Sequence, residues 1–391
     1  MIKYCNGNHL TLLQNGTDYF PALEAAIDQA QHHVYLESYI FAHDATGQRI
    51  GASLMRAAQR GVACRLLIDG YGSQNYPAAA LTTLRNAGVS ALVYRPHISP
   101  WRFPRQHLRR LHRKLAVIDQ QYAFVGGINI VDDAKLPDAP PQFDYAVRVT
   151  GPLVATIQQE MHNLHTRLAW AQLHQSRNAK AKPLPAPAAA GNIRAAFVLR
   201  SSLRHRRDIE NAYLSAIGKA RQEIVLANPY FLPGRRFRKA LLHAAMRGVK
   251  VRLLLQGRYE FRVVHYASRA LYSQFLAAGI EIFEYQPSIM HAKVAVIDGH
   301  WSTVGSSNID PTSLFLLREA NIVVDDHSFA AALQASLNNA ITHAAQQITR
   351  DNLHQGSKLD RALHWLAYSM NATSSAKNNG SSSAHGPSAM P

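Results

Sequence analysis

The chain has only two cysteines, Cys5 and Cys64, among its 391 residues. Two cysteines cannot build a disulfide framework, and neither stands at the spacing of a zinc site, so the chain is expected to work in a reducing compartment. It also lacks a run of about 18 apolar residues, which a membrane-spanning helix needs. Its first residues have no apolar core of the kind that a signal peptide has. Any association with a membrane is therefore expected to be peripheral.

Acidic residues are also scarce. The 25 Asp and Glu residues stand against 42 Lys and Arg residues, which gives a formal net charge of +17. Such a charge favours polyanionic partners, either nucleic acid or an anionic membrane surface. Hydrophobic residues make up 47% of the chain, enough for a globular core. The length leaves room for two domains or for one large duplicated domain.

One pattern, H-x-K-x4-D-x6-G-x2-N, occurs twice, at residues 112–129 and at residues 291–308. In each copy an apolar run, 115–118 or 294–297, predicts a buried strand, and the residues after it predict a two-residue hairpin turn. Such turns pair residue 119 with 122 and residue 298 with 301. This pairing sets four pairs of residues opposite one another: His112 and Asn129, Lys114 and Gly127, His291 and Asn308, Lys293 and Ser306. Each hairpin then presents an imidazole, an ammonium and an amide on one face.

Predicted strands alternate with predicted helices before each motif, which favours a largely parallel sheet with helices outside it. A turn at Asn15–Gly16 is expected before the first helix, with Thr17 or Asp18 as its cap. The same order of segments repeats in the second half, so the chain is interpreted as an internal duplication. Its simplest architecture is α/β, with two halves related by a pseudo-two-fold axis and both hairpins meeting at that axis. The expected divisions are a first half at 1–175, a Pro/Ala-rich linker at 176–192, a second half at 193–350 and a largely disordered extension at 351–391.

The halves differ most just before the motif. Twelve more residues separate Pro96 from His112 than separate Pro287 from His291. The extra segment is basic and aromatic, with Trp101, Arg102, Phe103 and Arg105. Such a segment is a candidate for contact with a membrane interface or a phosphate, and a solvated loop is the alternative.

Two histidines, two lysines and two asparagines indicate phosphate chemistry with no metal or other cofactor. The lysines, helped by Asn129 and Asn308, can neutralise the non-bridging oxygens of a phosphate. One histidine can attack phosphorus, while the other protonates the departing alcohol and deprotonates the incoming one. A metal ion is disfavoured at the histidine pair, because a lysine two residues from each histidine repels a cation.

An imidazole used in this way is oriented by an acid on its other nitrogen. Asp144 and Glu319 stand at matching places downstream of the two hairpins, and either acid can serve either histidine. Asp119 and Asp298 fall in the turns, so their role is expected to be mainly structural.

At these residues the chain resembles the phospholipase D superfamily, whose signature is a duplicated HxKxxxxD motif followed by a GSxN-type element. The second copy, Gly305-Ser306-Ser307-Asn308, matches that element, whereas the first, at 126–129, departs from it at the Ser. The resemblance runs from about residue 4 to about residue 345. Within the superfamily it points to the bacterial cardiolipin synthases, those of type B in particular.

The resemblance implies a phospholipase D-like duplicated α/β sandwich with the active site between its halves. It implies transfer of a phosphatidyl group between two phosphatidylglycerol molecules, giving cardiolipin and glycerol through a phosphatidyl-histidine. It also implies a peripheral protein on the cytoplasmic side of a bacterial membrane, with no cofactor. Together with the inserted segment, it makes His112 the nucleophile and His291 the acid and base. The motif residues carried over as catalytic are His112, Lys114, Asp119, His291, Lys293 and Asp298, with Ser306 in support.

Three other readings stay open. A phospholipase D-type nuclease would use the same site and turn the basic charge to DNA, although minimal nucleases of this kind are shorter, single-motif dimers. A hydrolytic phospholipase D would differ only in letting water take the second step. A non-catalytic nucleic-acid-binding protein would explain the charge but not the two complete motifs. Anionic phospholipid at a membrane surface is therefore the favoured partner over nucleic acid.

Overall fold

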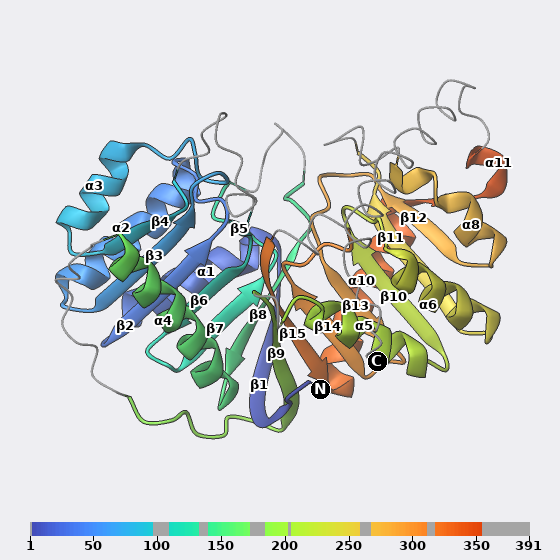
Figure 1. The fold of residues 1–391 in the computed structure, drawn as a ribbon, viewed down its shortest axis with the longest axis horizontal. Coiled ribbons are helices and arrows are strands. Elements are labelled where there is room, and N and C mark those ends of the chain that lie inside the picture. Colours follow the sequence, from blue (N-terminus) through green and yellow to red (C-terminus); the bar gives the residue numbers. More distant parts are fainter. Residues whose placement is uncertain are drawn as a thin grey trace, which may run out of the picture.

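The computed structural model describes residues 2–96, 109–132, 140–172, 184–201, 205–258, 267–310 and 317–353. Two runs of elements follow each other in nearly the same order (Figure 1). The first run contains β1 (Cys5–Gln14), α1 (Asn15–Gln29), β2 (His33–Ser38), α2 (Ala45–Gln59), β3 (Ala63–Asp69), α3 (Ala78–Asn86), β4 (Ser90–Tyr94), β5 (Arg110–Leu111), β6 (Lys114–Ile118), β7 (Tyr122–Gly126), β8 (Tyr145–Thr150) and α4 (Leu153–Ala171). The second run contains β9 (Ile193–Arg200), α5 (Asp208–Lys219), β10 (Glu223–Asn228), α6 (Arg235–Met246), β11 (Lys250–Gln256), α8 (Tyr272–Ala277), β12 (Glu281–Tyr285), β13 (Val294–Ile297), β14 (Trp301–Gly305), β15 (Leu317–Asp325), α10 (His327–Ala344), β16 (Ala345–Ile348) and α11 (Arg350–Leu353).

The strands follow one hydrogen-bonded order, β16-β12-β11-β10-β13-β14-β15-β9-β1-β8-β7-β6-β2-β3-β4, and β5 pairs with β15 off this path. In each half three strands run parallel, β2-β3-β4 in the first and β10-β11-β12 in the second. The motif hairpins, β6–β7 and β13–β14, add antiparallel strands on the inner side. The halves join where β1 pairs antiparallel with β9, at the lower middle of Figure 1.

Three large apolar cores separate the layers, and a smaller fourth cluster includes Leu92, Leu111 and Leu164. The central core combines residues from both halves, including Val147 of β8 and Val304 of β14, with residues of α4 and α10 such as Ile157 and Leu333. One outer core lies under α1 and α2, and the other under α5 and α6. Strands that have a core on both faces must be apolar on both faces, and every residue of β13 is accordingly buried. This layering confirms the predicted α/β sandwich of two repeated halves.

The predicted register of both motif hairpins is wrong by one residue. In the first hairpin Ile118 pairs with Tyr122 and Lys114 with Gly126, so three residues form the loop where two were expected. Asp119 and Gln120 have φ values of 49° and 58°, a left-handed pair that closes the turn, and the N–H of Gln121 donates to the carbonyl of Ile118. Residues 119–121 thereby lie outside the ladder. The second hairpin has the same offset, since Ile297 pairs with Trp301, and so neither expected pairing of histidine with asparagine forms.

The first helix also begins earlier than predicted. Its first residue is Asn15, where a turn was expected, and Gln14 at its N-cap makes no side-chain cap. Asp18 lies within the first turn, and its carboxylate accepts from the backbone N–H of Gln14 at 2.9 Å. Within the part of the chain that the structure describes, no helix is both long and apolar enough to cross a membrane. The expected disorder of the C-terminal extension concerns residues that, from 354 onward, lie outside the described ranges.

Candidate active site

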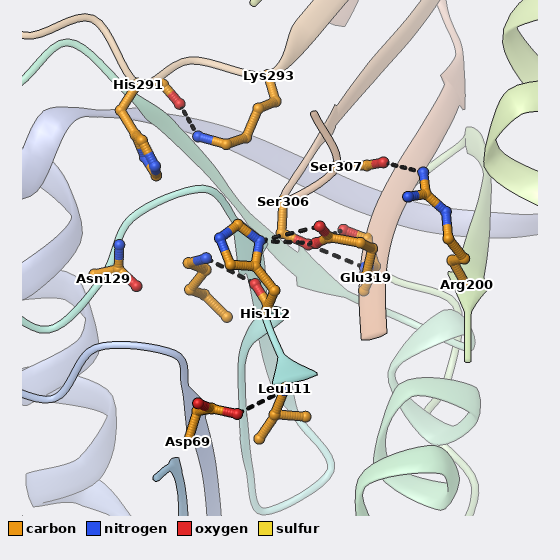
Figure 2. Close-up of polar contacts among 12 residues, drawn as sticks. Asp69, Leu111, His112, Asn129, Arg200, His291, Lys293, Ser306, Ser307 and Glu319 are labelled. Atoms are coloured by element: carbon orange, nitrogen blue, oxygen red, sulfur yellow. Dashed lines mark hydrogen bonds and ion pairs between the residues drawn. The ribbon is translucent and has the colours of Figure 1, made fainter. Parts of the chain in front are cut away.

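Each histidine of the repeated motif bonds a carboxylate from the other half of the chain. His112 follows β5 in the first half, and its Nδ1 lies 3.0 Å from Oε1 of Glu319 in β15. His291 precedes β13 in the second half, and its Nδ1 lies 2.6 Å from Oδ2 of Asp144, just before β8. Figure 2 shows the first of these pairs with His291 nearby. The two halves therefore complete each other's histidine–acid pair.

The backbone enforces this crossing. The N–H of His112 donates to the carbonyl of Arg318 at 3.0 Å, because β5 runs parallel to the start of β15. The N–H of His291 donates in the same way to the carbonyl of Phe143 at 2.8 Å. In both places the residue before the acid holds the backbone of the histidine, so the acid itself falls beside the imidazole.

The first pair is buried, and its charges are set by its surroundings. Burial by itself would raise the pKa of Glu319, but His112, Lys114 and Arg200 together hold that pKa below its ordinary value, so the carboxylate is ionised. Burial lowers the pKa of His112 against the opposing pull of Glu319, so the ring is neutral near pH 7. An ionised acid at Nδ1 favours the tautomer with its proton on Nδ1, which leaves a lone pair on Nε2. His112 is thereby prepared to attack an electrophile or to accept a proton.

The two motif lysines are buried beside the histidines. Nζ of Lys114 donates to the backbone carbonyl of His112 at 2.7 Å, and Nζ of Lys293 donates to that of His291. Burial lowers the pKa of Lys114 to about 7, and the nearby charge of Lys293 adds to this effect. Nζ of Lys114 also lies 5.3 Å from the ring centroid of Tyr39, whose ring stands 4.6 Å from that of His112. Two buried lysines in this position suit an anionic ligand, which would favour the charged form of Lys114.

The GSxN-type segments at the ends of the two hairpins differ at their second residue, and the two acids explain this difference. Ser306 donates its hydroxyl to Glu319 and accepts from the N–H of Ala320 at 3.1 Å. The first half has Gly127 at the matching place, and a Cβ there would lie 2.3 Å from Oδ1 of Asp144. Aspartate is one methylene shorter than glutamate, so its carboxylate sits closer to the strand and leaves no room for a serine. The first copy therefore has Gly127 where the GSxN pattern has Ser, because the carboxylate of Asp144 occupies that space.

The two asparagines of the motifs differ in their hydrogen bonds. Oδ1 of Asn129 accepts from the backbone N–H of Ile40 at 3.1 Å, which fixes the amide and directs its NH₂ group elsewhere. Oδ1 of Asn308 is buried and has no hydrogen-bond partner among the residues that the structure describes. Figure 2 shows Asn129 on the side of His112 that faces away from Glu319.

Asp119 and Asp298 lie at the far ends of the hairpins from the histidines. Asp119 accepts from the backbone N–H groups of residues 31, 32 and 33 at 2.6, 2.8 and 2.7 Å. Asp298 accepts from those of residues 221, 222 and 223 at 2.8, 2.9 and 3.0 Å. Each aspartate thus ties its hairpin to the chain entering β2 or β10, and neither lies beside the imidazoles.

Sequence reasoning missed the residues that hold the segments before the histidines. Oδ2 of the fully buried Asp69 accepts from the N–H of Leu111 at 2.8 Å (Figure 2), and its Oδ1 accepts from Nε of Arg110 at 3.1 Å. Oε1 of Gln256 accepts from the N–H of Met290 at 3.1 Å in the same way. The aligned segments Leu-Leu-Ile-Asp69-Gly and Leu-Leu-Leu-Gln256-Gly are the signal that could have found them.

Trp101, Arg102, Phe103 and Arg105 lie outside the described residues. Among the residues that the structure does describe, no group of three His, Cys, Asp or Glu side chains could hold a metal ion.

A family model described as "Cardiolipin synthase, PLD-like domain" matches residues 23–164 and 213–341. The chain belongs to this family. It is 40% identical over 354 residues to Cardiolipin synthase B of Salmonella typhi, a match that covers 89% of this chain and 84% of the relative. Cardiolipin synthase B of Escherichia coli K12 is 40% identical over 347 residues, covering 88% and 82%. Cardiolipin synthase of Geobacillus kaustophilus is 33% identical over 316 residues, covering 79% and 61%. The family predicted from the two motifs is confirmed.

Solved structures agree on the fold of this family member. Phosphatidylserine synthase of Haemophilus influenzae superposes with a TM-score of 0.71 at 12% identity and covers 95% of this chain and 94% of its own. Polyphosphate kinase of Porphyromonas gingivalis gives a TM-score of 0.55 at 13% identity, with 94% of this chain and 53% of its own covered. At such identities the likeness shows the fold alone, and it confirms the predicted duplicated α/β fold.

Proposed function

We propose that this cardiolipin synthase family member transfers a phosphatidyl group from one phosphatidylglycerol to another and releases glycerol. One observation carries the proposal: the buried imidazole of His112 and the half-buried imidazole of His291 are each held at Nδ1 by an acid of the opposite half and stand beside two buried lysines. This set supplies two nitrogen groups for proton transfer and nucleophilic attack, and two cations for a phosphate. Its relatives bear the name of the same activity.

The first step forms a phosphatidyl-histidine. Nε2 of one histidine attacks phosphorus, and the bond from phosphorus to the headgroup glycerol oxygen breaks. The other histidine gives its Nε2 proton to that oxygen, and glycerol leaves as a neutral alcohol. We assign His112 as the nucleophile, because its ring is neutral at rest and its Nδ1 proton is held by an ionised acid. His291 is then the proton donor.

The second step reverses the proton flow. His291, now neutral, takes the proton from a headgroup hydroxyl of the second phosphatidylglycerol. That oxygen attacks phosphorus, the bond between phosphorus and the histidine nitrogen breaks, and cardiolipin forms. Both histidines return to their starting states, so two phosphatidylglycerols give one cardiolipin and one glycerol.

The lysines and asparagines would stabilise the charge on phosphorus throughout. Lys114 and Lys293 are buried, so their attraction for the non-bridging oxygens is screened little by water. The amides of Asn129 and Asn308 add hydrogen-bonding groups at the edge of the same space. Asp144 and Glu319 orient the imidazoles and stabilise them when they carry a positive charge.

We further propose that the protein works at the cytoplasmic surface of a bacterial membrane, as a peripheral protein. Its formal charge of +17 suits an anionic lipid surface, where each basic residue near the surface contributes about 1 kcal/mol. Binding to vesicles rich in phosphatidylglycerol should weaken as salt rises. Replacing Trp101, Arg102, Phe103 and Arg105 together should also weaken binding to these vesicles. If the fraction of protein bound to vesicles were unchanged, that segment would be an ordinary solvated loop.

Radiolabelled phosphatidylglycerol and plasmid DNA, assayed side by side with the same enzyme, test the function. Cardiolipin and glycerol in equal amounts, with intact DNA, are expected. Phosphatidic acid as the main lipid product would make the enzyme a hydrolase of the phospholipase D type. Cleaved DNA with unchanged lipid would make it a nuclease.

A further inference from the structure

The duplication makes the surroundings of His112 and His291 equivalent in position, but different residue types occupy the equivalent positions. The segment before His112, Arg110–Leu111, pairs with Leu317–Arg318, whereas Met290 before His291 bridges to Phe143. Arg318 and Phe143 are therefore equivalent, because each gives its carbonyl to a histidine N–H and precedes an acid. One flank carries a cation where the other carries a phenyl ring.

A second equivalent pair shows the same difference. Tyr94 ends β4 and is followed by Arg95, whereas Tyr285 ends β12 and is followed by Gln286. The guanidinium carbons of Arg95 and Arg318 lie 5.3 and 5.9 Å from the ring centroid of Tyr94. On the other flank, Phe143 stacks on Tyr285 with ring centroids 4.9 Å apart and planes inclined by 15°. The same tyrosine thus carries two arginines near His112 and an aromatic ring near His291.

A further arginine lies on the His112 flank. Nη1 of Arg95 donates to the backbone carbonyl of Arg109 at 2.9 Å, so these residues adjoin. We call the three residues Arg95, Arg109 and Arg318 the arginine flank.

Among the described residues, little neutralises the charge of this flank. None of their ion pairs joins a carboxylate to Arg95, Arg109 or Arg318. The nearby Asp69 is already bound to Arg110 at 3.0 Å. Arginines elsewhere are treated differently, since Arg49 pairs with Glu24 and Arg56 with Asp28. Gathering like charges without counter-charge is unfavourable in the free protein, and a bound anion would relieve it.

The proposed reaction brings such an anion. The phosphate of the donor lipid is matched by Lys114 and Lys293, but the acceptor lipid carries a second phosphate, three carbons from its attacking hydroxyl. Guanidinium groups bind phosphate through paired hydrogen bonds, and tyrosine contacts hold them in place. We propose that the arginine flank binds the phosphate of the acceptor phosphatidylglycerol. The inference rests on the proposed function and names the residues that select its acceptor.

The arginines would touch the acceptor's phosphate and not the reacting atoms, so their loss should change which alcohol is used. An anionic acceptor would lose its contact, whereas a neutral one would have had none. On the flank near His291, Phe143 and Gln286 take the places of Arg318 and Arg95, and Nε of Arg258 donates to the carbonyl of Gln286 at 2.5 Å. The two lipid positions of the enzyme are therefore unlike despite the duplication.

The test uses the variant Arg95→Gln/Arg318→Phe, which places on this flank the residues that the protein already has on the other. Its matched control is Arg235→Gln/Arg236→Gln, which removes two exposed arginines from α6. Each full-length enzyme receives phosphatidylglycerol in detergent micelles with two soluble acceptors, glycerophosphoglycerol and ethanol. The anionic and neutral transfer products are measured in one reaction by mass spectrometry. Vesicle binding is measured separately.

Transfer to glycerophosphoglycerol relative to ethanol should fall at least about tenfold in the flank variant, because hydrogen bonds between charged groups are lost. The control should keep the wild-type ratio. An unchanged ratio in the flank variant would overturn the inference. So would an unchanged ratio combined with weaker vesicle binding, which would make the arginines a docking surface for the membrane. Inhibition by inorganic phosphate equal to that by glycerophosphoglycerol would show a site for free phosphate and would overturn the lipid assignment. A wild-type enzyme that makes phosphatidylethanol but no cardiolipin would overturn the proposed function, and this inference with it.

Discussion

Oδ2 of Asp144 lies 2.6 Å from Nδ1 of His291, although 147 residues separate them along the chain. His112 and Glu319 form the mirrored pair, 207 residues apart. Neither half therefore contains a complete histidine–acid pair, and the assembled pair of halves is the smallest unit in which both imidazoles are oriented. A duplication that exchanges acids in this way couples the geometry of the site to the packing of the central core.

Loss of either acid should cost activity without unfolding the protein. Asp144→Asn and Glu319→Gln keep the shape of each side chain but remove the charge that orients the imidazole and stabilises its protonated form. We expect cardiolipin formation to fall by about 10²-fold or more in each variant. Glu24→Gln, which breaks an exposed ion pair with Arg49, is the matched control and should retain wild-type activity. Full activity in either acid variant would remove the orienting role.

The motif aspartates should behave differently. Asp119→Ala leaves three backbone N–H groups without their carboxylate, so the free energy of unfolding should fall by about 2–4 kcal/mol. At a temperature where the variant is folded, its activity should exceed that of His112→Ala by orders of magnitude. Denaturant unfolding and product assays on the same sample separate the two effects. An Asp119→Ala protein of normal stability but no activity would place this residue in the chemistry.

The free energy of unfolding should depend on pH through Asp298, which ties the second hairpin to the chain as Asp119 ties the first. Burial would raise the pKa of Asp298, but the three N–H groups of residues 221–223 hold it below its ordinary value. A carboxyl whose pKa is lower in the folded state contributes stability above its unfolded pKa and loses it as pH falls through the folded value. That loss should appear below about pH 4, and Asp298→Asn should remove it. A variant that keeps the wild-type acid limb would contradict this origin.

The sequence allowed the site residues to be predicted better than their neighbours. The repeated motif predicted both histidines and both lysines, and the two acids were predicted from matching places downstream of it. The structure brings these six residues together. The predicted register of the hairpins was wrong by one residue. The longer loop needs left-handed backbone angles at Asp119 and Gln120. Gly and Asn usually signal such angles in a sequence, whereas Gln does not. Which acid serves which histidine could not be predicted either. It follows from the pairing of β5 with β15, which joins segments about 200 residues apart and leaves no local pattern.

The lowered pKa of Lys114 should appear in the pH profile of the enzyme. In the free enzyme the side chain loses its proton as pH rises through about 7, and with it the charge that receives the phosphate. kcat/KM should therefore fall above that pH, whereas kcat should fall only at higher pH, because a bound phosphate favours the protonated lysine. Lys114→Arg cannot lose its charge in this range and should lack the alkaline limb, even at a lower rate. An unchanged limb in this variant would assign the titration to another group.

The same lysine should make the free protein less stable at low pH. Unfolded Lys114 holds a proton up to its ordinary pKa of 10.5, whereas the folded form releases it near 7, so the unfolded state binds more protons between these values. The free energy of unfolding should then rise with pH across that window. Lys114→Met should flatten this slope and abolish activity while leaving the protein at least as stable at pH 7. A less stable variant would show that the ammonium supports the fold.

Activity should persist in excess EDTA. Lys114 and Lys293 provide the positive charge that a divalent ion provides in other phosphoryl-transfer sites, and no proposed step needs a metal-bound nucleophile. Cardiolipin formation is compared before and after exhaustive chelation. Complete loss, restored by one specific metal, would contradict the mechanism.

The two histidines should separate the two steps of transfer. A histidine that attacks phosphorus needs a release step of its own, and the second histidine already stands where it can activate the acceptor. Removing either should cost several orders of magnitude in rate, because members of a cooperating catalytic set do not act additively. His291→Ala keeps the proposed nucleophile and should trap the phosphatidyl-enzyme when the leaving group needs no protonation. His112→Ala cannot form that adduct. Each variant is incubated with a phosphatidyl donor bearing an activated leaving group, quenched in base to preserve phosphohistidine, and mapped by mass spectrometry. An adduct on His291 in the His112→Ala protein would exchange the two roles, and near-normal transfer by either variant would remove the two-histidine mechanism.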